Sequence, residues 1–81
     1  MPLIQLFEKF AFYTSNGLYT GMVTSEGDFQ SCDEVFLKDQ NVTNAEVIKD
    51  DLLLCTINDK NGISKLVTVE VNEEKVEVII D

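Results

Sequence analysis

Short runs of β-forming residues, separated by turn residues, constrain the fold of this 81-residue chain more than any other feature of its sequence. Asn16–Gly17 stands between two such runs, and Asn-Gly in that setting favours a hairpin because both residues tolerate positive φ. Strands are predicted at residues 12–14, 18–24, 35–37, 52–57, 63–71 and 74–80. Gly21, inside the second of these, predicts a bend or bulge. The pattern predicts antiparallel β structure with short connections, as in a small barrel or sandwich.

The first ten residues follow a different pattern. Leu3, Leu6, Phe7 and Phe10 recur at i, i+3, i+4 and i+7, and Pro2 suits a first helical turn. We therefore expect a short amphipathic helix over residues 1–10, whose apolar stripe covers one mouth of a barrel. One or two turns are too short to span a bilayer.

Small size limits how this chain gains stability. At this length, folding buries only roughly 60% of the surface of the unfolded chain, so a disulfide, a metal or a partner subunit commonly contributes. Histidine is absent, and Cys32 and Cys55 are the only cysteines, with no CxxC pair. We expect two structural thiols, no metal and no cofactor, which leaves oligomerisation as the source of added stability. The first residues lack a secretory signal, so a cytoplasmic protein with reduced thiols is expected.

The charge of the chain is strongly negative. Fifteen acidic residues stand against six lysines and no arginine, which gives a formal net charge of −9. Arginine is the usual bidentate reader of phosphate and guanine, so its absence in a negative field opposes general nucleic-acid binding. The charge favours either a plain solvated surface or a basic partner.

No enzyme signature is present. Serine nucleophiles lack a histidine base, and the sequence has no glycine-rich phosphate loop. The acidic pairs 33–34, 50–51 and 73–74 would need a cleft to shift their pKa values before serving as acid and base. The chain is too short to offer much of one, and we expect no catalytic residues.

Two segments carry a family resemblance. The first comprises Asn16–Gly17, residues 21–23, a turn near Asp28 and residues 35–39, and the second runs through residues 69–71 and 76–79. In spacing they resemble the two motifs of the Sm/LSm/Hfq family. The resemblance implies one Sm-like domain, a five-stranded antiparallel SH3-like barrel with an N-terminal helix. Its parts would be the helix at 1–10, the first motif at 11–39, a variable loop or hairpin region at 40–62 and the second motif at 63–81.

The same resemblance implies a homo-oligomeric ring of five to seven subunits that binds RNA. At the positions where the family contacts RNA, this chain offers other residue types. Candidate ligand or RNA contacts are Phe29, Gln30, Cys32, Glu34 and Asn72, with Lys38 and Lys75 as the only nucleus for a basic face. A packed aromatic and a turn-forming asparagine are simpler interpretations of Phe29 and Asn72. The expected edges between subunits are Val67, Val69, Val71, Val76, Val78 and Ile80, whose strands carry little charge.

Two functions follow from these observations. The first is an Sm-like ring-forming binding module with weak intrinsic RNA affinity, because Glu34 and Glu73 place acids where the family binds a base. The second is an acidic protein-interaction or inhibitor domain that docks on the basic surface of a partner protein.

Overall fold

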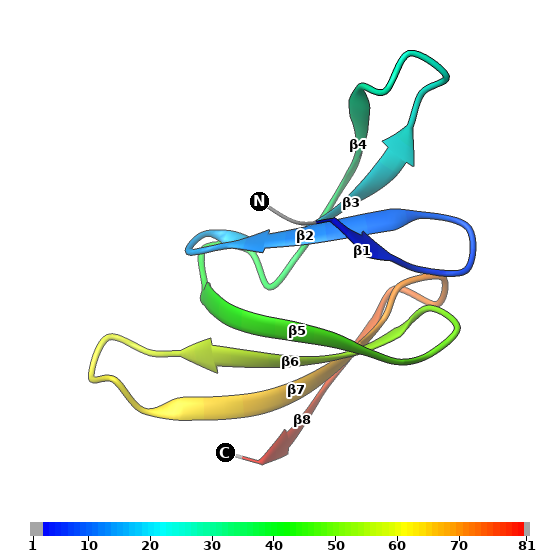
Figure 1. The fold of residues 1–81 in the computed structure, drawn as a ribbon. Helices are drawn as coiled ribbons and strands as arrows, with labels where there is room; N and C mark the ends of the chain where they lie inside the picture. Colours follow the sequence, from blue (N-terminus) through cyan, green and yellow to red (C-terminus); the bar gives the residue numbers. More distant parts are fainter. Residues whose placement is uncertain (1–2, 81) are drawn as a thin grey trace.

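The computed structural model describes residues 3–80, with the backbone alone at positions 32, 33 and 80, and it is all-β (Figure 1). Its strands form two four-stranded antiparallel sheets in the orders β1-β2-β3-β4 and β5-β6-β7-β8. The strands are β1 (Ile4–Gln5), β2 (Phe10–Thr14), β3 (Gly17–Val23), β4 (Phe29–Phe36), β5 (Asn41–Lys49), β6 (Leu52–Asn58), β7 (Ser64–Glu70) and β8 (Lys75–Ile80). The prediction of antiparallel β structure is confirmed.

The prediction of an N-terminal helix is wrong, and residues 3–80 contain no helix at all. Ile4 pairs with Ala11 across a hairpin whose turn is closed by the Leu6 N–H donating to the Lys9 carbonyl at 2.8 Å. Leu6 is buried, whereas Phe7 is 68% exposed, so the helical stripe does not become one buried face. An isolated helix this short is marginal, and pairing with β2 satisfies the same backbone groups.

The prediction of a closed five-stranded barrel is also wrong. The second sheet does not continue from the first, and β1, β4, β5 and β8 are all edge strands. Residues 37–40 connect the sheets through a tight turn in which Leu37 and Asp39 have φ of 54° and 63° and the Gln40 N–H donates to the Leu37 carbonyl. The chain reverses direction at this turn, and β5 begins the second sheet. In a closed barrel the strand would instead have continued past this point within the same sheet. The region 40–62, expected to hold a variable loop or hairpin, forms the antiparallel pair of β5 and β6.

The hydrophobic core lies between the two sheets, where β2 and β3 pack against β5. Strand alternation directs every second residue inward: the buried residues of β6 are Leu53, Cys55 and Ile57. The inward residues of the first sheet include Ala11, Leu18 and Thr20. The burial of Cys55 agrees with the expectation of a structural thiol at this position.

The hairpin turn predicted at Asn16–Gly17 is confirmed, and a second hairpin turn joins β6 to β7. Thr14 pairs with Gly17 across the first, and Asn58 pairs with Ser64 across the second. In the second turn the Asp59 carboxylate accepts hydrogen bonds from the N–H groups of Asn61 and Ile63, at 2.8 and 2.9 Å. Asp59 is therefore a turn-forming residue, the role that aspartate side chains commonly take in such loops.

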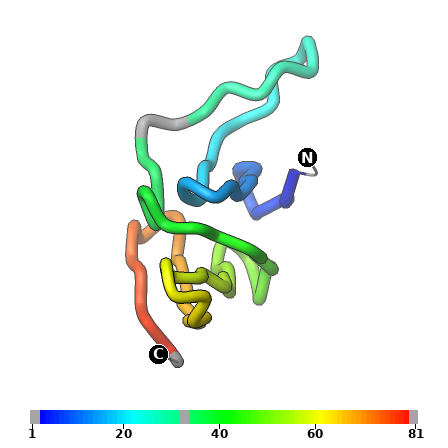
Figure 2. The backbone as a smooth tube through the Cα atoms, turned by 90° about the vertical axis from the view of Figure 1, so that its left-hand side faces the viewer, coloured from blue at the N-terminus to red at the C-terminus, as the bar shows by residue number. Residues whose placement is uncertain are grey.

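The β3–β4 hairpin projects away from the packed sheets, and we refer to residues 21–31 as the arm (Figures 1 and 2). A register shift between Tyr19 and Gly21 marks its base, in keeping with the bend or bulge predicted at Gly21. At its tip, the Thr24 N–H donates to the Asp28 carbonyl at 2.8 Å and the Asp28 N–H donates to Thr24 Oγ1 at 3.1 Å. The arm is thus an ordered hairpin with a closed turn.

No helix capable of crossing a bilayer occurs in the described part of the chain.

Candidate functional site

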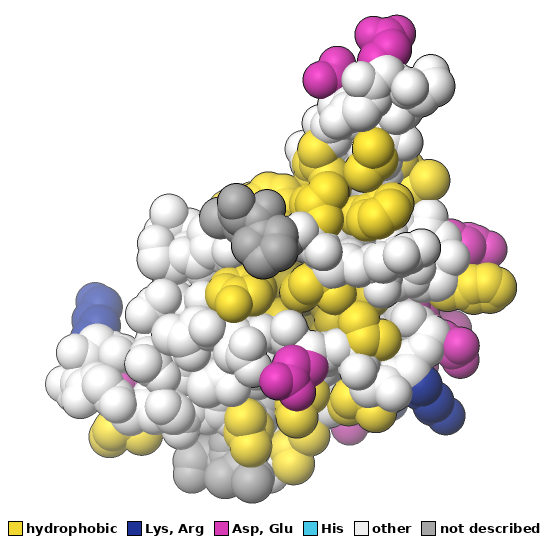
Figure 3. All heavy atoms as spheres, viewed as in Figure 1, with side chains coloured by type: hydrophobic (Ala, Val, Ile, Leu, Met, Phe, Trp, Pro, Cys, Tyr) yellow, Lys and Arg dark blue, Asp and Glu magenta, His cyan; other side chains and the backbone are white. Residues whose placement is uncertain are grey.

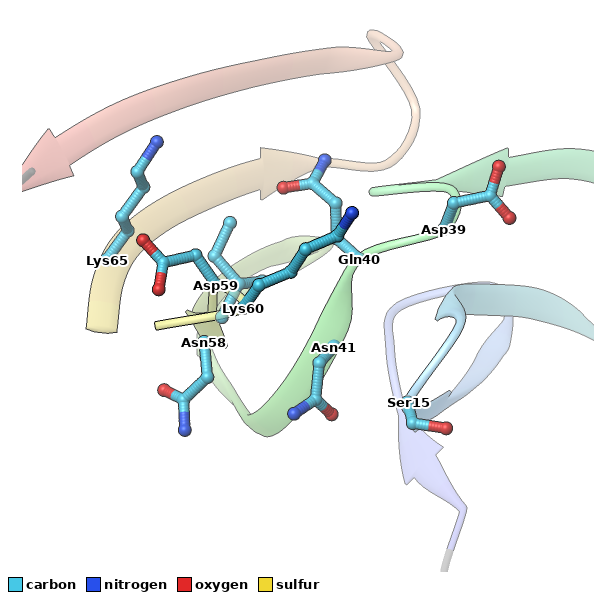
Figure 4. A pocket seen from close by; sticks show the side chains of 9 residues that line it. Ser15, Asp39, Gln40, Asn41, Asn58, Asp59, Lys60 and Lys65 are labelled. Carbon is cyan, nitrogen blue, oxygen red and sulfur yellow. The ribbon is translucent and has the colours of Figure 1, made fainter. Parts of the chain in front are cut away.

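A surface hollow lies where the β2–β3 turn, the connection between the sheets and the β6–β7 turn meet (Figure 4). It encloses about 380 Å³ and is lined by Ser15, Asp39, Gln40, Asn41, Ile57, Asn58, Asp59, Lys60 and Lys65. Its polar side chains do not converge: Asn41 and Asn58 point to one side and Lys65 to the other. The Asp59 carboxylate is occupied by its own turn. This arrangement suits solvent more than a bound small molecule.

Acidic and sulfur ligands are not grouped for metal binding. Among the described residues, no three His, Cys, Asp or Glu side chains lie where they could hold one ion. Cys55 is fully buried, and burial raises the pKa of its thiol to about 11. A thiol in such surroundings is protonated at neutral pH and is a poor nucleophile.

The candidate contacts before the third predicted strand all lie on β4. Gln30 and Glu34 are exposed, and the side chain of Cys32 lies outside the described residues. Phe29 is half-buried, with its ring 5.1 Å from that of Phe12 in an edge-to-face contact. Phe29 therefore belongs to an aromatic cluster, whereas Gln30 and Glu34 face solvent.

Asn72 and the two lysines lie apart. The Asn72 N–H donates to Asp51 Oδ2 at 2.8 Å in the β7–β8 turn, which is a structural role for its backbone. Lys38 is exposed in the connection between the sheets. Lys75 begins β8 and forms an ion pair with Glu77 at 2.8 Å. The hydrogen bond and charge of Glu77, followed by the charges of Glu70 and Glu73, raise the pKa of Lys75. Acids thus surround this lysine.

The six residues expected at subunit edges divide into two groups. Val67, Val69 and Val71 are at most 1% exposed and belong to the core of the chain itself. Val76 and Val78 are exposed. The side chain of Ile80 lies outside the described residues. Only β8 therefore offers described side chains from this set to a neighbour.

The outer side of the first sheet carries a face that sequence reasoning did not predict. Ladder register places Phe10, Phe12, Tyr19, Val23, Phe29 and Val35 on this side, opposite the core residues Ala11 and Leu18. We call these six residues the aromatic face. All but Val23 are half-buried, and Val23 is 37% exposed.

Packing within the aromatic face is specific. The rings of Phe12 and Tyr19 stack with centroids 5.2 Å apart, and Phe29 meets Phe12 edge to face. Both geometries are favoured between aromatic side chains. None of the six residues packs against the core cluster, which draws its partly buried neighbours from Ile4 and Tyr13. The aromatic face is therefore a second apolar layer, on the side of the first sheet that faces away from the core.

Gly21 makes room for this layer. A Cβ at this position would lie 2.7 Å from Phe29 Cζ and 2.3 Å from the Gln30 carbonyl oxygen. The Phe29 ring thus packs directly against the backbone of Gly21, which carries no side chain. Beyond it, the tip of the arm carries Glu26 and Asp28, and Figure 3 shows acidic side chains at the tip above a patch of hydrophobic ones.

The signal for the aromatic face was the alternation of Phe10 and Phe12 across from Tyr19. Assigning Phe10 to a helix concealed it.

No family model matches this sequence, and the comparisons with curated proteins and with solved structures returned no match.

Proposed function

We propose that this protein is a non-enzymatic interaction domain that docks on a basic, partly apolar surface of a partner protein. The proposal rests on one observation: six apolar side chains, among them a Phe12 ring in contact with the rings of both Tyr19 and Phe29, form a layer outside the core. A contiguous apolar patch rimmed by polar residues is typical of an interaction site. Aromatic residues are enriched among those that dominate binding energy.

Charge specifies the kind of partner. Glu26 and Asp28 are exposed at the arm tip, Glu34 is exposed beside the aromatic face, and the whole chain carries −9. Complementary charge at the rim of an apolar contact accelerates association and selects the partner. A basic protein surface with apolar side chains at its centre fits this combination.

The second candidate is the Sm-like ring of five to seven subunits with RNA as its ligand, supported by the motif spacing at residues 16–39 and 69–79. Single-strand binding draws on basic grooves and exposed stacking rings. Lys75 is an exposed lysine flanked by acidic side chains, and Phe12 stacks on Tyr19 within the chain. These features favour a protein partner over RNA.

The test uses a peptide of about twelve residues alternating Lys and Leu, a basic strand-forming probe, against a matched peptide alternating Glu and Leu. Titration followed by NMR of the labelled protein should give binding of the Lys peptide only, with shifts at the aromatic face. Val23→Asp should weaken binding tenfold or more even though it adds a negative charge. Val47→Asp is the matched control, because Val47 on β5 is 40% exposed, against 37% for Val23.

A second pair of variants tests the contribution of charge to binding. Glu26→Lys at the arm tip should weaken binding of the Lys peptide and reduce its salt dependence, whereas Glu73→Lys in the β7–β8 turn should have a smaller effect. Equal effects of Val23→Asp and Val47→Asp would refute docking on the aromatic face. Tighter binding of oligo(U) than of the Lys peptide would favour the Sm-like candidate instead.

A further inference from the structure

The outermost strand of the second sheet, β8, has a free edge. It pairs with β7 alone, and no described strand pairs with its other side (Figure 2). The first sheet packs against β5, at the opposite edge of the second sheet. Every second residue of β8 therefore presents an unpaired N–H and C=O outward, which is a template for another strand.

The side chains of β8 do little to protect this edge. Val76, Val78 and Ile79 are 43%, 57% and 55% exposed, and the strand contains no proline. Val76 and Val78 pair with the buried Val69 and Val67, so they extend the core face of the sheet to its rim. An additional strand paired beside Val76 would cover that side chain with a continuation of the same apolar face.

The two charged residues of β8 indicate which kind of strand can pair with its free edge. Lys75 and Glu77 lie on the other face of the strand, with Lys75 Nζ 2.8 Å from Glu77 Oε1. If a second β8 runs antiparallel and a two-fold axis passes through Val76, each Lys75 stands directly opposite the Glu77 of the other copy. The four charges then alternate in sign around a square. Opposite charges directly across a strand pair are stabilising, and like charges are destabilising.

We infer that β8 pairs with β8 of a second copy of this chain, in an antiparallel register centred on Val76. The contact is self-complementary, as a two-fold interface must be. It joins two four-stranded sheets into one of eight strands, with Val76 against Val76 on the core side. It is independent of the proposed docking on a basic partner, because the aromatic face belongs to the other sheet.

The overlap is short, so the dimer is weak. Glu74 has a φ of 53° and belongs to the β7–β8 turn, which ends the pairing just before Lys75. Such an edge contact is smaller than the roughly 1,200–2,000 Å² of a stable interface, and we expect a weak dimer that dissociates on dilution. Dimerisation at cellular concentration would therefore be reversible.

The test is sedimentation of the full chain over a range of concentrations at about 150 mM salt, where charges beyond about 8 Å are screened. Lys75→Glu and Glu77→Lys should each weaken the dimer roughly tenfold, because each turns two attractive cross-strand pairs into repulsive ones. The double variant Lys75→Glu/Glu77→Lys should restore it. Both side chains are about 60% exposed, so the fold tolerates these changes.

The change in net charge separates local cross-strand pairing from general repulsion between two acidic subunits. Glu77→Lys reduces the mutual repulsion of two acidic subunits, so weaker association can only reflect the local pairing. Lys49→Glu and Glu46→Lys, on β5 at the opposite edge, are matched controls that should leave the dimer unchanged. A wild-type monomer at millimolar concentration, a double variant that fails to recover, or an assembly of five to seven subunits would each overturn the inference.

Discussion

Replacing Gly21 with alanine tests whether the aromatic face and the arm depend on bare backbone at that position. A Cβ there would lie 2.3 Å from the Gln30 carbonyl oxygen, 2.7 Å from Phe29 Cζ and 2.8 Å from Ser31 Cα. Real Cβ atoms essentially never approach other atoms this closely. Two of the three neighbours are backbone atoms of β4, so a rotamer change cannot relieve the clash. The paired strand itself must move.

The cost follows from packing. Overpacking that forces backbone shifts costs typically 1–3 kcal/mol and occasionally more, and we expect about 3 kcal/mol here because backbone obstructs backbone. A domain of this length has a free energy of unfolding of roughly 4–12 kcal/mol. Gly21→Ala should therefore remove a quarter or more of the stability of the protein. It should also separate Phe29 from Phe12.

Gly62→Ala is the matched control. Gly62 has a φ of 79° but open space around it, so an added Cβ there meets strain without collision and should cost roughly 1–2 kcal/mol. Urea unfolding of both variants, followed by tyrosine fluorescence and circular dichroism, measures the difference. A Gly21→Ala variant no less stable than Gly62→Ala would refute the proposed close packing of Phe29 over the backbone.

Four further predictions concern the core and RNA. Cys55→Ser should lower the free energy of unfolding by roughly 1–3 kcal/mol, because a hydroxyl replaces a fully buried thiol; thermal melts measure this. Stability of the wild type should fall as pH rises above 9, since burial raises the pKa of Cys55 to about 11 and only the unfolded thiol ionises freely. Thr20→Val should stabilise by about 1 kcal/mol in urea unfolding, because Thr20 Oγ1 is buried without a hydrogen-bond partner among the described residues. Anisotropy with labelled oligo(U) should give binding weaker than micromolar at about 150 mM salt; tight binding abolished by Lys38→Glu would contradict this.

Local turn chemistry made much of the fold predictable. Asn16–Gly17 and the residues around Asp59 specify hairpins by their own backbone preferences, and the structure has both. The strands on either side of the second turn alternate cleanly, so β6 and β7 lie close to their predicted ranges. Where short-range signals agree with the final pairing, sequence reasoning was sufficient.

The parts of the fold that the sequence did not predict depend on which strands pair in the folded protein. The family resemblance placed β5 in a variable region, and the register shifts after Val42 and Val47 break the alternation that would have marked it as a strand. The stripe from Leu3 to Phe10 fits a helix as well as a hairpin, and only contact with β2 selects the hairpin. The aromatic face was hidden for the same reason: Phe29 was recognised, but its neighbours Phe12 and Tyr19 come from two other strands.

The order of strands in both sheets follows the order of the chain, and this has a consequence for how quickly the protein folds. The widest separations between paired residues, Leu18 with Phe36 and Leu52 with Glu70, are eighteen positions. Folding rates rise as contacts become more local in sequence, because less loop-closure entropy is lost before pairing is rewarded. Each half can zip hairpin by hairpin without waiting for the other. Sheet formation should therefore be fast for an all-β chain, and docking of the two halves through residues 37–40 should be its slow step.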